Sequence, residues 1–127
     1  MSTEVDEKLK QYKTMQEDIQ KLFAQKQTLL GQFNENTMVK GELDLLDDDS
    51  KVFKLVGPVL MTVELEESKG NVGKRLEFIE AELKKIDSSI EAKQGEMATL
   101  GDEIAKAQQR MQAEAVAAVK EVAANSS

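Results

Sequence analysis

Apolar residues recur at heptad spacing along two long stretches of the chain, one before residue 34 and one after residue 64. In the second stretch the series is broken by one charged residue; its members are Val72, Leu76, Ile79, Leu83, Ile86, Ile90, Lys93, Met97, Leu100, Ile104, Ala107 and Met111. Steps of alternately four and three residues place these positions on one helical face, which is typical of a coiled-coil seam. The pattern predicts a helix over residues 64–123.

The first stretch shows the same period. One heptad position holds Val5, Tyr12, Ile19, Lys26 and Phe33, with Lys26 as the charged exception, and the second holds Met15, Leu22 and Leu29. Acidic residues in the first turn suit the positive end of a helix dipole. The pattern predicts a helix over residues 3–34. We expect an interruption at residues 34–36 and then a short separate helix over residues 37–46, with these residues facing inward: Met38, Val39, Leu43 and Leu46.

A β-hairpin is predicted between the two helical stretches, over residues 51–63. Its strands, Val52–Val56 and Val59–Val63, are rich in β-branched residues, and Gly57-Pro58 suits a two-residue loop. Glycine accepts the positive φ that a type II′ turn needs at its first position, and proline has the negative φ of the second. Residues 47–50 are expected to form the turn that precedes the hairpin.

Both faces of the predicted hairpin are largely apolar. One face carries Val52, Lys54, Val56, Val59, Met61 and Val63, and the other carries Phe53, Leu55, Leu60 and Thr62. Two strands alone are at best marginally stable in water, so we expect the hairpin to meet partner proteins that complete a sheet. The alternative is a local flap that packs on the chain's own helices.

Two helices on either side of a hairpin most simply fold back on each other as an antiparallel coiled coil. Pairing outward from Phe33 and Val72 places Val5 near Leu100 and leaves the second helix without an intramolecular partner beyond about Ile104. Apolar residues beyond that point belong either to a frayed, alanine-rich tail or to an adaptable contact surface.

Composition narrows the possible classes of function. Charged residues make up 32% of the chain and aromatic residues 4%, which fits a helical coiled-coil protein better than a compact globule. The net charge of −7 disfavours binding to nucleic acid. The chain has neither Cys nor His, which removes disulfides and the commonest general base. No stretch resembles a signal peptide or a membrane span, so we expect a cytoplasmic protein with no membrane partner.

We predict no enzyme activity, no metal site and no cofactor. The run Asp47–Asp49 lacks the central glycine and the closing glutamate of an EF-hand loop. Basic residues between Lys69 and Lys85 alternate with glutamates, which is typical of a salt-bridged helix surface. An acidic-site hydrolase would need a pocket-forming core that this composition does not favour.

The segment VFKLVGPVL at residues 52–60, followed by VGKRL at residues 72–76, resembles the beta-type subunits of the prefoldin family. The preceding ENTMVK at residues 35–40 and ELDLL at residues 42–46 strengthen the resemblance. It implies one domain over residues 1–127 with a mainly α fold. That fold is a long antiparallel coiled coil with one central β-hairpin, which joins an intersubunit β-barrel.

The resemblance also implies a function. Family members are co-chaperones that assemble as hetero-hexamers of alpha-type and beta-type subunits. They hold unfolded client proteins, such as actin and tubulin chains, and transfer them to the cytosolic group II chaperonin without ATP. We therefore expect assembly contacts at Val52, Phe53, Leu55, Val56, Val59, Leu60 and Met61. We expect client contacts at Val5, Leu9, Ile104, Met111, Val116, Val119 and Val122.

The alternative function is that of a structural coiled-coil adapter or scaffold with a single defined partner. The hairpin argues against it, because a simple coiled-coil rod does not need a β-rich insert in mid-chain. The number of partners separates the two hypotheses. A chaperone complex should contain five related small helical partners in addition to this chain, whereas an adapter should form a homodimer.

Overall fold

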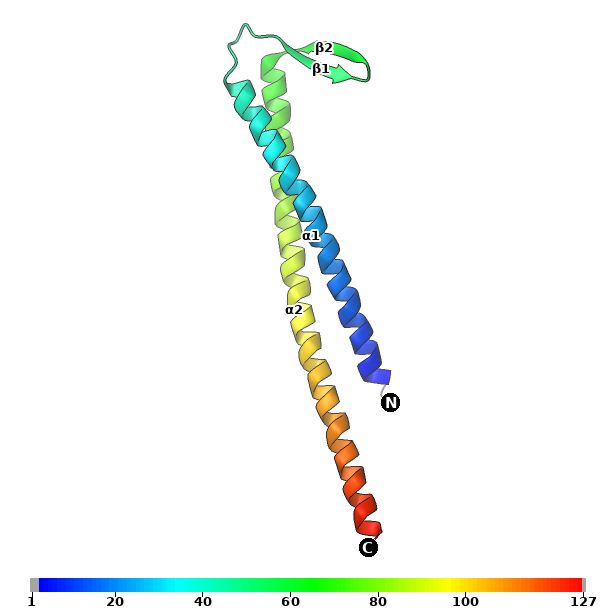
Figure 1. Cartoon of the computed structure of the whole chain (residues 1–127). Helices are drawn as coiled ribbons and strands as arrows, with labels where there is room; N and C mark the ends of the chain where they lie inside the picture. Colours follow the sequence, from blue (N-terminus) through cyan, green and yellow to red (C-terminus); the bar gives the residue numbers. More distant parts are fainter. Residues whose placement is uncertain (1–2, 127) are drawn as a thin grey trace. The chain divides into compact units, whose positions relative to one another are not determined.

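The computed structural model describes residues 3–126. Along the chain it contains α1 (Thr3–Asp44), β1 (Val52–Val56), β2 (Val59–Val63) and α2 (Leu65–Asn125), as Figure 1 shows. These elements pack as two compact units. The hairpin unit comprises residues 23–88, and the terminal unit comprises residues 3–22 together with residues 89–126. The predicted mainly helical fold with one hairpin is confirmed, whereas the single domain over residues 1–127 and the intersubunit barrel stay predictions.

The hairpin has the predicted strands and register. Val52 lies opposite Val63, Leu55 opposite Leu60, and Val56 opposite Val59 in an antiparallel pair. Gly57 has a φ of 58°, the positive value that the first position of a type II′ turn requires. Before the hairpin, the Ser50 amide donates a hydrogen bond to the Asp47 carbonyl at 2.9 Å, which closes the predicted turn.

The core of the hairpin unit lies where the two helices adjoin the hairpin. Leu43, Leu65 and Val72 form a buried cluster, and Val52 and Leu76 pack against it. Leu43 comes from the last turn of α1 and Leu65 from the first residue of α2, so the cluster ties the two helix ends together. Burial continues along the predicted seam of α2 at Ile79 and Ile86. In this unit the predicted seam of α2 is therefore buried at Val72, Ile79 and Ile86.

The predicted interruption at residues 34–36 and the separate helix over residues 37–46 were wrong, because α1 is continuous to Asp44. The Asn36 Nδ2 donates to the Gln32 carbonyl at 2.7 Å, and the Thr37 Oγ1 donates to the Phe33 carbonyl at 2.8 Å. Both side chains thus bond to their own helix instead of stabilising a turn. Asparagine costs a helix only about 0.7 kcal/mol relative to alanine, too little to break one that lacks glycine and proline there.

The end of α1 also differs from prediction in what it buries. Leu43 is buried, but the other three residues expected to face inward are exposed: Met38, Val39 and Leu46. The expectation assumed a short helix packed on its own face. In the continuous α1, Leu43 occupies the seam while Met38 and Val39 lie on the exposed side, and Leu46 lies beyond the end of the helix at Asp44.

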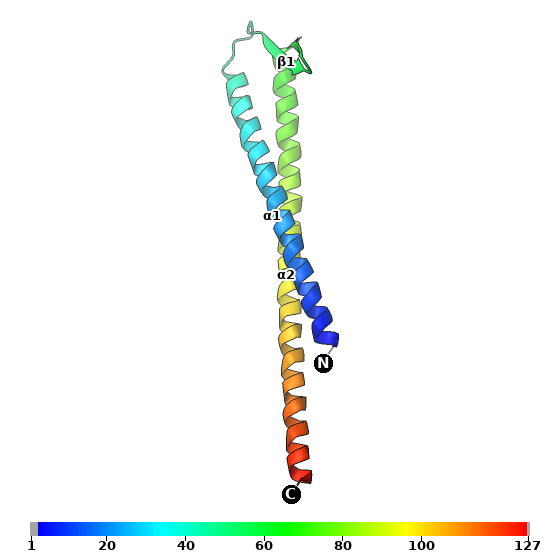
Figure 2. The same ribbon diagram turned by 45° about the vertical axis from the view of Figure 1, so that its right-hand side comes forward.

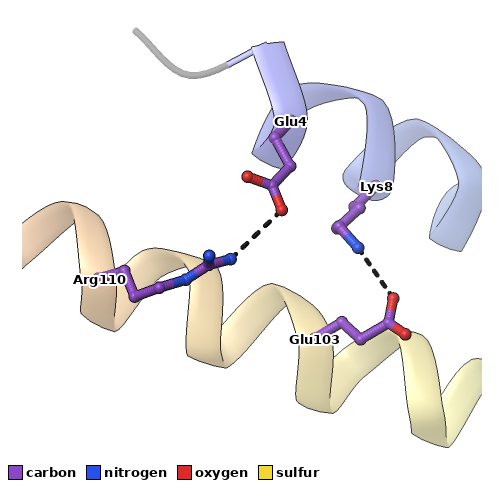
Figure 3. A network of polar contacts seen from close by, with 4 residues as sticks. All are labelled: Glu4, Lys8, Glu103 and Arg110. Carbon is purple, nitrogen blue, oxygen red and sulfur yellow. Dashed lines mark hydrogen bonds and ion pairs between the residues drawn. The ribbon is translucent and has the colours of Figure 1, made fainter.

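The terminal unit is an antiparallel pair of helices with a narrow apolar seam. Its buried residues are Val5 and Ile19 from α1 and Ile90, Leu100, Ile104 and Ala107 from α2. Two ion pairs flank the seam (Figure 3): the Lys8 Nζ lies 2.9 Å from the Glu103 Oε2, and the Arg110 Nη2 lies 3.3 Å from the Glu4 Oε1. Residue numbers rise along α1 as they fall along α2, which confirms the antiparallel coiled coil.

The pairing register differs from the predicted one by roughly two helical turns. Glu4 and Lys8 pair with Arg110 and Glu103, so Val5 lies opposite the segment between those two residues and not opposite Leu100. The error follows from the missed end of α1. Val72 packs with Leu43 and not with Phe33, which moves the whole pairing outward along α2.

Candidate interaction surfaces

The hairpin exposes most of its apolar side chains. Six residues predicted for assembly have between 49% and 66% of their surface exposed, and we call them the hairpin surface: Phe53, Leu55, Val56, Val59, Leu60 and Met61. They lie on both faces of the two-stranded sheet, since side chains alternate along each strand. The flap alternative fails for these six residues, because the chain's own helices leave their side chains uncovered. Contiguous exposed apolar residues of this kind mark a protein interaction site.

Val52 has a different place from the other predicted assembly residues. It is half-buried and packs on the cluster of Leu43, Leu65 and Val72 within the chain. Its cross-strand partner Val63 is half-buried as well. The base of the hairpin is thus held by the helices, and its outer part is presented to solvent. Val52 positions the hairpin surface and is not part of it.

The end of α2 offers a second exposed surface. Within the terminal unit, α2 continues past the start of α1 (Figure 2), and every described residue from Met111 to Ser126 is exposed. We call residues 112–126 the C-terminal segment. Val116, Val119 and Val122 follow each other at steps of three, with 49%, 68% and 66% of their surface exposed. Three valines with that exposure on one helix have no covering partner among the described residues.

Two residues predicted for client contact are instead part of the core. Val5 is 7% exposed and Ile104 is 8% exposed, because the two helices of the terminal unit pack over them. Ile104 was expected where the pairing of the helices ends, and the misplaced register put that end too early along α2. Leu9 and Met111 belong to the same unit and are exposed. Of the predicted set, the exposed residues are therefore Leu9, Met111, Val116, Val119 and Val122.

Sequence reasoning missed two exposed apolar residues in the hairpin unit. Leu45 follows the end of α1 and is the most exposed large apolar residue described, and Phe78 lies on α2 next to the buried Ile79. Phe78 could have been found from the sequence, because an aromatic residue beside a heptad position must point away from the seam. Leu45 could not, since its exposure depends on where α1 ends.

Residues 3–126 contain neither a metal-binding cluster nor a membrane-spanning helix. In residues 3–126 no group of three acidic side chains is placed to hold a metal ion. None of the helices in that range is long and apolar enough to cross a bilayer. The exposed apolar surfaces of the hairpin and of the C-terminal segment are thus the features that call for a functional explanation.

Comparison with known proteins gives a consistent result. The sequence model of the family described as prefoldin subunit matches residues 6–111. The chain is similar to "Probable prefoldin subunit 6" of Drosophila melanogaster, with 43% identity over 104 residues that cover 82% of this chain and 83% of the relative. It is 39% identical to "Prefoldin subunit 6" of Homo sapiens over 104 residues, or 82% of this chain and 81% of the relative.

Two further matches extend the comparison. "Probable prefoldin subunit 6" of Caenorhabditis briggsae is 47% identical over 85 residues, which cover 67% of this chain and 66% of the relative. Among solved structures, the prefoldin beta subunit from Thermococcus strain KS-1 aligns with a TM-score of 0.78 at 22% identity. That alignment covers 84% of this chain and 93% of the other, and it shows that the two chains share a fold.

Proposed function

Because this chain belongs to the prefoldin subunit family and is therefore a chaperone subunit, we propose that it works within a hetero-hexamer of alpha-type and beta-type subunits. The complex holds unfolded polypeptides such as actin and tubulin chains. It then transfers them to the cytosolic group II chaperonin without ATP, in the cytoplasm. Family membership supports each of these steps, and the two exposed surfaces of the chain support a separate region for assembly and for client contact.

The hairpin surface is the observation that carries the assembly proposal. Six large apolar side chains stand exposed on both faces of a sheet that has only two strands in the described chain. Burying apolar surface contributes about 25 cal/mol per Å², so covering these side chains with partner strands supplies a substantial driving force. Strand edges that remain unpaired add backbone hydrogen bonds to the same interface.

Client contact is proposed for the C-terminal segment and for two further exposed residues of the terminal unit, Leu9 and Met111. The segment is rich in alanine and extends an existing helix, so it needs no new nucleus to stay helical. Its valines have no covering partner within the described chain that would have to move before an unfolded client could bind them. Apolar side chains on a single helix can bind many sequences, because the contact needs no matching pocket.

The assembly proposal is tested by pulling the tagged full-length chain from native cytosol and measuring the intact mass of what it binds. Five further small subunits with prefoldin sequences support the proposal. A homodimer, or a complex with one unrelated protein, favours the structural adapter instead. Adding chemically unfolded actin to the purified complex and following light scattering then tests client holding.

A further inference from the structure

A groove of about 320 Å³ runs beside β1 in the hairpin unit. Its apolar lining comes from all four elements of that unit: Val39, Leu43, Val52, Phe53, Leu55, Val63 and Val72. The only charged side chains that line it are Lys54 from β1 and Arg75 from α2. The groove is therefore apolar with two positive charges and no negative one.

Neither cation is neutralised within the described chain. Lys54 and Arg75 are both exposed, and neither takes part in an ion pair or a side-chain hydrogen bond in residues 3–126. Lys26 and Lys85 of the same unit pair with Asp87 and Glu82, so it is their place beside the groove that sets Lys54 and Arg75 apart from its other unpaired lysines. Two like charges beside an apolar groove favour an occupant that brings carboxylates, because a guanidinium and an ammonium bind carboxylates by charge-assisted hydrogen bonds.

The backbone of β1 indicates how such an occupant would lie. Val56 and Val59 flank a two-residue loop, so they form a hydrogen-bonded pair. Hydrogen-bonded and non-hydrogen-bonded pairs alternate along an antiparallel ladder. Phe53 and Leu55 consequently direct their N–H and C=O groups away from β2, toward the edge of β1. Both residues line the groove, so this edge can accept a third strand there.

We propose that the groove takes an extended segment of a neighbouring prefoldin subunit, which pairs with the β1 edge and sets a carboxylate against Lys54 and Arg75. This inference rests on the assembly proposed above, and it adds that the charges of Lys54 and Arg75 select which subunit becomes the neighbour. The two cations act as a specificity device: an acidic and apolar strand is accepted, while a basic strand is rejected by like-charge repulsion.

A second copy of this chain does not supply that strand. Its own strands read VFKLV and VLMTV, with one lysine and no acidic residue. Self-pairing would bury apolar side chains but would leave Lys54 and Arg75 without a carboxylate and bring a further lysine to the sheet. The strand chemistry of the chain therefore favours a neighbour of different sequence.

The inference is tested in the reconstituted complex with carbodiimide, which couples a lysine amine to a carboxylate that contacts it. We expect the Lys54 peptide to be joined to an Asp or Glu in a strand segment of another subunit. In the Arg75→Lys variant, the new lysine should couple to that same acidic segment of the other subunit. Coupling to a client protein, to the Asp47–Asp49 turn of a second copy, or to no acidic residue would each overturn the inference.

Charge reversal gives an independent measurement. We expect Lys54→Glu combined with Arg75→Glu to weaken incorporation of the chain into the complex at least about tenfold. Lys74→Glu combined with Lys84→Glu is the matched control, since both lysines are exposed on α2 and neither lines the groove. Incorporation of the double variant should be restored by a compensating change in the neighbour. That change replaces the acidic residue found by carbodiimide coupling with lysine.

The outcomes separate this inference from the assembly proposal. If the wild-type chain does not enter a complex with other prefoldin subunits, assembly itself is wrong. If the wild-type chain enters it and the double charge reversal enters equally well, assembly stands and the role of Lys54 and Arg75 is refuted. Equal losses for this double variant and for the Lys74→Glu, Lys84→Glu control would also refute it, since the effect would then reflect net charge alone.

Discussion

The Lys26 Nζ lies 2.7 Å from the Asp87 Oδ1, so the charged residue that interrupts the predicted seam of α1 is paired with a carboxylate of α2. The interruption in the α2 seam is resolved in the same way, since the Lys93 Nζ lies 3.7 Å from the Asp18 Oδ2. A polar residue at a seam position selects one register at some cost in stability. Each lysine would lose its carboxylate if the helices slipped by a heptad.

The first prediction concerns this pairing. Asp87→Ala should lower the free energy of unfolding by no more than about 1 kcal/mol, because the pair is partly solvent-exposed and is screened by salt. A double-mutant cycle with Lys26→Met, followed by urea unfolding at low and at high salt, should show a coupling that shrinks as salt rises. Glu82→Ala is the control, since its pair with Lys85 lies within one helix. A coupling independent of salt would contradict the electrostatic explanation.

Removal of the C-terminal segment should separate client holding from assembly. A chain that ends at Met111 keeps Ala107 in the seam and Arg110 against Glu4, so it should still assemble. It should suppress client aggregation less, because the exposed valines are gone. Aggregation of unfolded actin followed by light scattering is the measurement. Ending the chain after Ala105 would be a poorer test, because it would also remove those two contacts with α1.

A full-length variant sharpens this test. Val116→Gln, Val119→Gln and Val122→Gln together keep the helix, since glutamine has a higher helix propensity than valine. This triple variant should lose as much client protection as the truncation. Ala115→Gln with Ala118→Gln is the control, which adds the same polar side chains but keeps the valines. Full protection by the triple variant would remove the C-terminal segment from the client-binding proposal.

The hairpin surface should control assembly. Leu55 and Leu60 lie opposite each other across the strands, and both are about two-thirds exposed. Changing both to Asp should release the subunit, because covering two carboxylates without partners costs several kcal/mol. Co-purification with the other subunits measures the loss. Leu9→Asp is the control, because Leu9 belongs to the terminal unit. This variant should still co-purify with the other subunits but should hold unfolded clients less well.

Replacing two glycines by alanine should change stability in opposite directions, with Gly57→Ala destabilising and Gly95→Ala stabilising. Gly57 has a left-handed φ of 58°, so Gly57→Ala should cost about 1 kcal/mol or more and weaken the hairpin. Gly95 lies inside α2, and an added Cβ would meet nothing within 4 Å. Gly95→Ala should therefore stabilise the helix by about 1 kcal/mol. Thermal unfolding of the complex containing each variant checks both signs, and a stabilising Gly57→Ala would exclude the proposed turn.

The heptad spacing and the strand pattern determined the main elements of this protein. Seam residues such as Ile79 and Ile90 step regularly along α2, and the Gly57-Pro58 loop fixes the hairpin register, because both depend on neighbours close in sequence. The family also followed from local sequence, since VFKLVGPVL and VGKRL are contiguous segments. The apolar side chains of both surfaces could be named in the same way.

The tertiary structure decided where α1 ends and how far the two helices are offset. Asn36 bonds back to its own helix, so α1 continues, Leu43 reaches Leu65 and Val72, and the pairing moves outward along α2. That offset buries Val5 and Ile104 and leaves Val116, Val119 and Val122 exposed. A heptad pattern cannot supply it, because a shift of one repeat keeps every apolar residue in the seam and changes only which residues meet. Long-range contacts, among them Lys26 with Asp87, select the offset.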